Sequence, residues 1–512
     1  MPGRPGMTAA HGSGAPGTTV LAGGRLPGAA APVDVHVVDG VVRRVAPAGA
    51  ACADRGHDRI ELGGRWIVPG LWDRHVHLSQ WAMVSRRLDV GGAGSAAEVV
   101  ALVASAVARG EREVVGFGYR DGLWPDAPTL DGLDAVSGDV PVVLVAADLH
   151  ACWVNRAAAR RHGALDAAGE SGVLREDDCF RLVRELDDLP DDVLDTWVDE
   201  ASRRAAARGV VGVVDLEMRW NRDDWARRAA RGADALRVRF GVYTRDLDRA
   251  AAAGLRSGDP VEGTHGLVRV GPYKVITDGS LNTRTAWCVD AYPGLGADAH
   301  PTGVVNVPFD ELVAHLRHAE RIGLDPAVHA IGDRANEDAL DALAAVRPRG
   351  WSGRASIEHA QLLRREDVRR FAGLGVVASV QPEHAMDDRD VADLYWAGRT
   401  DRAFMLRELA AAGVELALGS DAPVAPLDPW VAIAAAVGRT RDDRAPWHPE
   451  QSIDAGLALA ASTDGAGAVV REGMTADLAV IESDPLVASV GELRRMPVAL
   501  TVLAGRVTHR AL

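Results

Sequence analysis

The chain has 512 residues, of which 47% are hydrophobic, an ordinary fraction for a globular protein. This length exceeds what one small core fills, so a large domain with a smaller one is expected. The formal net charge of -15 argues against a nucleic-acid or anionic-membrane surface. A small-molecule substrate is therefore the expected partner.

The N-terminal residues 1–17 are rich in Gly, Pro and Ala and contain no apolar core. They predict a disordered leader, with Met7 as an alternative start. No apolar run approaches the ~18 residues that span a membrane. The four cysteines lack CxxC spacing, which argues against a disulfide framework or a cysteine zinc site. A reducing, cytoplasmic location fits this cysteine usage.

Strand signals occur at both ends of the chain. The runs at 33–38 and 40–45 are joined by Asp39-Gly40, a strong hairpin signal. The other signals lie at 18–22, 477–482, 497–503 and 506–509. The two ends together predict one small composite β-sandwich domain, built from residues 18–65 and 465–512.

Between these ends, β-branched runs alternate with helical stretches such as 310–322 and 336–346. Eight strands are expected: one ending near His75, and others at 211–215, 238–242, 268–276, 326–329, 355–358, 376–380 and 414–418. This alternation predicts an α/β fold, a (β/α)8 TIM barrel over residues 66–464. Residues 84–200 are too long for one crossover and predict an insertion after barrel strand 1. We expect helices and a short strand at 140–146 there, placed to cover the active-site mouth.

The apolar stretch 66–78 contains two histidines, His75 and His77, separated by one residue. Alternation along a strand places both imidazoles on one face, where they can ligate one metal ion. Two partly buried histidines satisfied by hydrogen bonds are the alternative.

Lys274 is the only lysine of the chain, and every other cation of this type is arginine. Because arginine is not deprotonated in proteins, this position indicates a need for a neutral nucleophilic amine. Carbamylation by carbon dioxide is one such need and gives a carboxylate that can bridge two metals. A buried lysine paired with Asp278 and a Schiff-base lysine are the alternatives.

His329 and His359 each end a predicted strand, and Asp421 ends the eighth. In a barrel the carboxyl ends of the strands meet at one face. Four imidazoles, a special lysine and a carboxylate form the ligand set of a two-metal hydrolase. Taken singly, each histidine could be structural, and Asp421 could be an N-cap.

Several stretches resemble the amidohydrolase superfamily, and within it amidohydrolase family 3, the YtcJ-like and N-substituted formamide deformylase-like hydrolases. The matching motifs lie at 69–77, 274–280, 285–286, 328–335, 357–360, 380–382 and 418–423, with further elements at 148–155 and 472–478. The resemblance covers nearly the whole chain beyond the leader. One departure is Trp72-Asp73-Arg74, where the family usually has a smaller residue before the aspartate and alanine after it.

The resemblance implies roles for the candidate residues. His75, His77 and Asp421 would bind the more buried metal, His329 and His359 the second, and carbamylated Lys274 would bridge them. One or two divalent ions are implied, with zinc expected. Asp421 would act as general base and then acid, and Lys274 would complete the catalytic set. Candidate substrate residues, each with a loop-structuring role as its alternative, are Trp124, His150, Asn155, Asp278, Ser280 and His384.

The chain is therefore predicted to be a metal-dependent hydrolase of an amide, N-acyl or N-formyl C–N bond in a small molecule, acting through a metal-activated hydroxide. A deaminase or cyclic amidase on the same site is the alternative enzyme. A non-catalytic barrel scaffold is the alternative outside catalysis, although no ligand position is missing. A homodimer is the default assembly.

Overall fold

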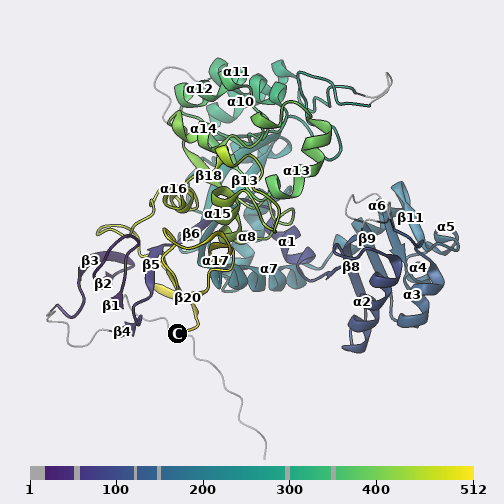
Figure 1. Ribbon diagram of the computed structural model, residues 1–512, viewed down its shortest axis with the longest axis horizontal. Helices are drawn as coiled ribbons and strands as arrows, with labels where there is room; N and C mark the ends of the chain where they lie inside the picture. The colour runs from purple at the N-terminus through teal and green to yellow at the C-terminus, as the bar shows by residue number, and fades with distance from the viewer. Residues whose placement is uncertain are drawn as a thin grey trace, which may run out of the picture. The chain divides into compact units, whose positions relative to one another are not determined.

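The computed structural model describes residues 18–50, 58–119, 121, 124–146, 151–294, 300–346 and 353–512. They form two compact units (Figure 1). One unit comprises the chain up to Leu78 together with Asp199–Leu512, and the other is Ser79–Val198. The predicted leader 1–17 and His150 lie outside the described residues.

The first unit contains an eight-stranded sheet whose neighbouring strands pair in parallel. Its order along the chain is β6 (Leu71–Val76), β12 (Val210–Asp215), β13 (Arg237–Tyr243), β14 (Val268–Ile276), β15 (Pro326–Ala330), β16 (Ser356–His359), β17 (Val377–Val380) and β18 (Leu416–Leu418). A parallel bridge between Val76 and Ala422 links the two edges of the sheet. The predicted eight-stranded barrel is confirmed.

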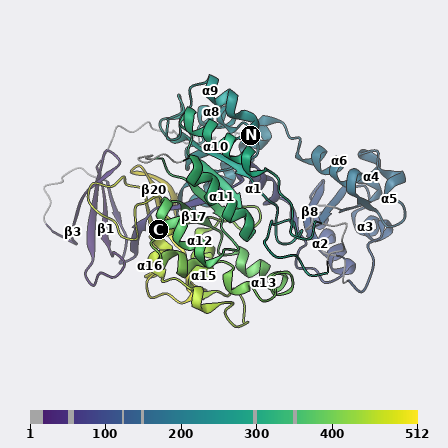
Figure 2. The ribbon, with the colours of Figure 1, turned by 90° about the horizontal axis from the view of Figure 1, so that it is seen from above.

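Helices alternate with the barrel strands along the chain and also follow the last strand, β18, and most of them are labelled in Figure 2. They are α8 (Asn221–Ala230), α9 (Leu247–Ala252), α10 (Phe309–Ile322), α11 (Asp333–Val346), α12 (Arg365–Leu374), α13 (His384–Tyr395), α14 (Leu406–Ala411), α15 (Pro429–Gly438) and α16 (Ala455–Ala461). The helix α7 (Asp191–Ala206) leads into β12, and α17 (Val490–Arg494) lies between the last strands. Strands such as β12 and β17 are buried at every residue, as expected for parallel strands covered on both faces.

Both ends of the chain build two four-stranded sheets. One contains β1 (Thr18–Gly24), β2 (Val33–Val38), β3 (Val41–Pro47) and β4 (Asp58–Glu61), and the other β5 (Trp66–Pro69), β19 (Leu478–Ile481), β20 (Val498–Leu503) and β21 (Arg506–Arg510). Leu21 and Val37 of the first sheet share one core with Val480 and Val502 of the second. Asp39 and Gly40 have φ of 52° and 72°, as the predicted hairpin turn requires.

The stretch 66–78 does not form one continuous strand. Residues Trp66–Pro69 pair with β19 of the sandwich, whereas Leu71–Val76 begin the barrel. Gly70 lies between the two strands and packs against Val211. A Cβ at this position would collide with the valine side chain, so the close approach requires glycine. The single apolar run therefore contributes strands to two sheets. The sandwich extends beyond residue 65, the boundary predicted from the sequence, and includes Trp66–Pro69.

The second unit is richer in strands than predicted. Its five-stranded sheet has the order β11 (Val173–Arg175), β10 (Ala151–Val154), β9 (Val142–Ala146), β8 (Val114–Tyr119) and β7 (Leu88–Asp89). Its helices are α2 (Ala96–Ala108), α3 (Leu130–Ser137), α4 (Arg156–Arg161), α5 (Leu165–Ala168) and α6 (Glu176–Asp187), and α1 (Leu78–Val84) leads into it. The short strand predicted at 140–146 is present as β9, and the other four strands were not predicted because they are short and lack long β-branched runs.

Alternate residues of β9 serve separate cores in this unit. Val142 and Leu144 pack with residues of α2 and α3, whereas Val143 and Val145 pack with residues of α4 and α6. Helices therefore cover both faces of its sheet. Cys152 and Cys179 are buried free thiols here, as is Cys288 in the first unit. Across the described part of the chain, every helix is too short or too polar to traverse a lipid bilayer.

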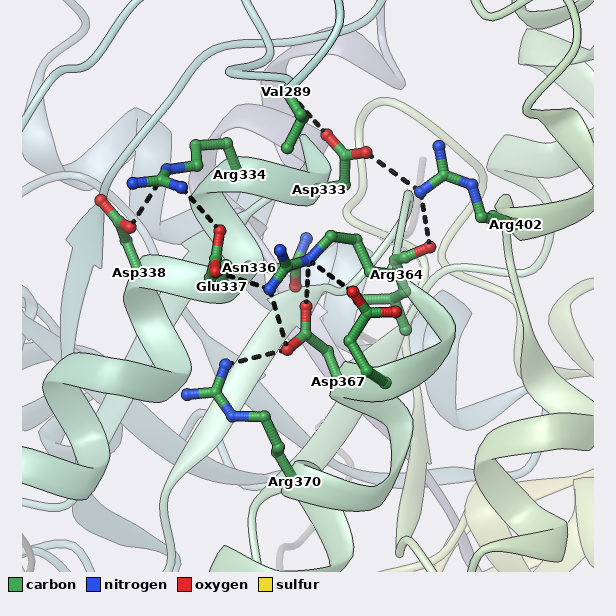
Figure 3. A network of polar contacts seen from close by, with 12 residues as sticks. Val289, Asp333, Arg334, Asn336, Glu337, Asp338, Arg364, Asp367, Arg370 and Arg402 are labelled. Carbon is green, nitrogen blue, oxygen red and sulfur yellow. Dashed lines mark hydrogen bonds and ion pairs between the residues drawn. The ribbon is translucent and has the colours of Figure 1, made fainter.

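A network of charged side chains ties α11 to α12 and to the loop after β14 (Figure 3). Asp333, the first residue of α11, accepts from the backbone N–H of Val289 at 2.8 Å and pairs with Arg402 at 3.1 Å. The fully buried Asp367 accepts from Arg364 at 3.0 Å and Arg370 at 2.8 Å. These contacts fix the helix that follows the strand carrying His329.

Replacing Asp367 with alanine should lower the free energy of unfolding by about 2 kcal/mol, because it leaves two partly buried guanidinium groups without this carboxylate. Chemical unfolding measures the loss. Glu366→Ala is the matched control, since the neighbouring Glu366 side chain is 68% exposed. That change should stay within about 0.5 kcal/mol of wild type. Equal effects of the two substitutions would contradict the role given to the network.

Candidate metal centre

The seam between β6 and β18 brings two distant parts of the chain together. The backbone N–H of Asp421 donates to the carbonyl of His75 at 2.7 Å, and that of His77 donates to Ala422 at 2.8 Å. A Cβ on Gly419 would lie 2.8 Å from the backbone nitrogen of His75, so only glycine allows this approach. Asp421 itself has φ of 54°, which turns its side chain at the end of β18.

The carboxylate of Asp421 faces both predicted histidines of β6. Its Oδ1 lies 3.4 Å from His75 Nε2 and 3.3 Å from His77 Nε2. His359 completes a compact group, because one donor atom from each of His75, His359 and Asp421 lies within 4.8 Å of the others. Such a convergence of ring nitrogens on one carboxylate is the donor set of a divalent transition metal.

His329 and His359 come from neighbouring strands and meet at one face. Their ring centroids are 4.4 Å apart, and His359 lies 5.1 Å from the ring of His75. His359 has φ of 73°, a left-handed conformation at the end of β16. The structure therefore brings all four predicted imidazoles and Asp421 together at the carboxyl ends of the strands.

Lys274 lies on β14 with 1% of its surface exposed. Its Nζ makes no hydrogen bond to any described residue. The carboxylates that act on it electrostatically are Glu358 and Asp421, so the alternative of a Lys274–Asp278 pair is wrong. Burial lowers the pKa of Lys274, which favours a neutral amine.

Burial is also the main influence on the imidazoles. It lowers the pKa of His75 and His359, and it lowers that of His329 to about 3. For Asp421 burial alone would raise the pKa, but the nearby imidazoles, His75 first, hold it well below its usual range. His77 differs, because although burial would lower its pKa, the neighbouring Asp421 carboxylate raises it.

Several buried ring nitrogens have no partner among the described residues. Those at the cluster are Nδ1 of His77, Nε2 of His329, Nδ1 of His359 and Nε2 of His384. Unpaired buried polar atoms are costly, and a bound cation would satisfy ring nitrogens that face the cluster. The residues present therefore fit a divalent metal ion.

Two buried carboxylates of the centre were missed by the sequence reasoning. Asp73 Oδ1 accepts from the backbone N–H of Ser420 at 2.9 Å and of His75 at 3.2 Å, which ties the two sides of the seam. Glu358 Oε2 lies 2.9 Å from His75 Nδ1. Both lie in matched motifs, next to residues already singled out, and that position is the signal that could have found them.

The predicted substrate residues of the first unit have different surroundings. Asp278 is fully buried and accepts from the backbone N–H groups of Trp287, Ile331 and Gly332 at 2.9–3.1 Å. Burial raises its pKa to about 7. Ser280 Oγ lies 2.9 Å from Thr283 Oγ1. The ring of His384 stacks on His359 with centroids 6.0 Å apart, which places it beside the cluster.

Two further candidates belong to the second unit. Asn155 is fully buried, and its amide bonds to Val142, Ala158, Ser137 and Val140. Trp124 donates from Nε1 to the carbonyl of Ala93 at 3.2 Å and packs against Tyr119. These contacts account for both side chains within their own unit, and their contact with a substrate stays a prediction.

Comparison with known proteins extends over most of the chain. A family model described as the amidohydrolase family matches residues 58–509. YtcJ of Bacillus subtilis (strain 168), which is named as an amidohydrolase, is 28% identical and covers 93% of this chain and 95% of its own length. An N-substituted formamide deformylase of Arthrobacter pascens is 26% identical, with coverages of 89% and 90%.

The fold is shared with solved structures as well. The crystal structure of a metal-dependent hydrolase from Pyrococcus horikoshii OT3 is similar, with a TM-score of 0.76 and 23% identity, over 93% of this chain and 99% of that one. The family match includes the strands that carry the four histidines, Lys274 and Asp421. The chain belongs to the amidohydrolase family.

Proposed function

We propose that this chain hydrolyses an amide-type C–N bond of a small molecule, such as an N-formyl or N-acyl amine. The observation that carries the proposal is the convergence of His75, His359 and Asp421, with donor atoms within 4.8 Å of one another. The family assignment supports a hydrolase, and the similar formamide deformylase supports this substrate class.

Five side chains would hold the metal. His75, His77 and Asp421 form one set, and His329 with His359 forms the other. Lys274 lies on β14, which stands between β6 with His75 and His77 and β15 with His329 in the order of the strands. When bound, divalent ions supply Lewis acidity that polarises the substrate carbonyl and acidifies a water molecule. Zinc suits a donor set rich in imidazole.

Asp421 is the residue that we assign to proton transfer. Its ionised carboxylate can accept a proton from the attacking water and pass it to the nitrogen of the leaving amine. A C–O bond then forms as the C–N bond breaks, giving a carboxylic acid and an amine. Buried side chains around Asp421 would keep bulk water away from this exchange.

Lys274 is the proposed site of carbamylation. A neutral amine adds to carbon dioxide, forming an N–C bond and releasing one proton, and the product is a carboxylate. The unpartnered, buried Nζ supports this, since a cationic lysine in the same place would lack a hydrogen-bonded counter-charge. The resulting carboxylate would reach between the two histidine sets.

The function is tested by incubating the purified chain with N-substituted formamides and N-acyl amines. Release of amine and carboxylic acid is expected, together with up to two divalent ions per chain by elemental analysis. Removal of metal by a chelator should abolish turnover, and zinc should restore it. Ammonia as the product would indicate the deaminase instead, and a metal-free chain with chelator-resistant turnover would contradict the proposal.

Asp421→Asn should keep the fold and much of the metal but reduce kcat by about 10²- to 10⁴-fold, because an amide cannot shuttle the proton. Steady-state kinetics and elemental analysis measure the two effects. Asp390→Asn is the control, since the Asp390 side chain is 73% exposed and pairs with Arg444. A kcat for Asp421→Asn within a few-fold of wild type would assign the proton transfer to another group, such as His384.

Lys274→Arg should lose activity although it keeps a cation, because arginine cannot form the carbamate. Lys274→Ala should also be inactive, and short carboxylic acids in the buffer should partly restore turnover by replacing the missing carboxylate. Carbon-13 NMR with labelled bicarbonate should detect the carbamate in the wild-type chain. Full activity of Lys274→Arg, or an unmodified amine in active metal-loaded protein, would overturn this assignment.

A further inference from the structure

The strand β16 places two side chains of consecutive residues toward the metal centre. Glu358 and His359 would point to opposite faces in a regular strand. The left-handed φ of 73° at His359 breaks this alternation at the end of the strand. Glu358 therefore reaches His75 from inside the barrel, while His359 also lies beside His75.

The carboxylate of Glu358 is held in one orientation. Its Oε1 accepts from the hydroxyl of Ser356 at 2.5 Å, and its Oε2 lies 2.9 Å from His75 Nδ1. The His75 side chain is 1% exposed and that of Glu358 is 4% exposed. Oε1 is thus held by a hydrogen bond, whereas Oε2 lies close to His75 with no hydrogen bond from a described residue.

An ionised carboxylate at this place has room for hydration. Glu358 lines a pocket of about 410 Å³ near the amino-terminal ends of the barrel strands, together with Ser356, Ser379, Arg74 and Arg354. Ser379 Oγ also has no partner among the described residues. Such a polar pocket can hold water, which lowers the cost of keeping a charge within the barrel.

The contact bears on which ring nitrogen of His75 carries the proton. A carboxylate oxygen only accepts, and Oε2 of Glu358 has no hydrogen-bond partner among the described residues, so a proton on Nδ1 of a neutral His75, 2.9 Å away, would face an unsatisfied acceptor. The lone pair is then on Nε2, the atom that faces Asp421 Oδ1 at 3.4 Å. Gln381 Nε2 also lies near Nδ1, but at 3.4 Å, and an amide can present either its oxygen or its nitrogen.

We propose that Glu358 is a positioning residue of the metal centre, which holds His75 in the Nδ1–H tautomer with Nε2 presented to a divalent cation. Carboxylates behind metal-binding histidines act in this way, and their loss typically costs 10- to 100-fold in metal affinity. The inference rests on the proposed metal-dependent function and gives a role to a residue that was not among the predicted site residues.

The experiment compares the zinc dissociation constants of the full-length chain and its variants, by competition with a chromophoric chelator. Glu358→Gln keeps size and removes charge, and its amide N–H can pair with Nδ1 and favour the wrong tautomer. Zinc binding should weaken 10- to 100-fold. Gln381→Leu is the matched control at the same ring nitrogen, and it should change the constant less than about threefold.

A second variant and a second readout keep the test independent of folding. Glu358→Asp retains the charge but withdraws it from His75, so it should also weaken zinc binding. The visible absorption of the Co²⁺-loaded protein should change in both Glu358 variants, because it reports the ligand geometry, and stay unchanged in Gln381→Leu. Zinc binding and spectra like those of wild type in both variants would overturn the positioning role. Absence of metal binding by the wild-type chain would instead overturn the proposed function.

Discussion

The centre depends on the closure of the barrel between its first and last strands. Asp421 N–H donates to the carbonyl of His75, and Asp73 accepts from the N–H groups of Ser420 and His75. Gly419 permits the close approach. These bonds join backbone groups and one buried carboxylate. The seam therefore fixes the backbone positions of His75 and Asp421, from which their side chains extend. The donor set follows from the closed sheet.

Once closed, the barrel surrounds a group of charges that needs a cation. The low pKa of Asp421 keeps it ionised beside His75, His329 and His359, whose pKa values burial lowers, and Glu358 is a second carboxylate behind His75. Buried charges without compensation are strongly destabilising, whereas metal coordination offsets that cost. The same electrostatic arrangement that would weaken an empty fold is therefore what gives the site its affinity for a divalent ion.

The sequence predicted the barrel, the sandwich and the cluster of four histidines with Asp421, because parallel topology collects strand ends at one face. It pointed to the neighbourhood of Glu358 through the motif at 357–360 but not to its side chain, since regular alternation assigns Glu358 to the face opposite His359 and the φ of His359 reverses this. It also missed Asp73, whose task is to accept backbone N–H groups. The second unit was underpredicted because short strands carry little periodic signal.

Not every motif residue contributes chemistry, and the structure shows how Arg74, which follows Asp73 in the motif at 69–77, is accommodated. Its side chain pairs with Asp464, which also binds Arg239. Arg74 lines the pocket near the amino-terminal ends of the barrel strands along with small residues such as Ser379 and Ala417, which leave space for the long side chain. Since the guanidinium extends to Asp464, its charge is compensated there. The guanidinium of Arg74 is therefore directed to Asp464 and makes no ion pair with the proposed metal-binding side chains among the described residues.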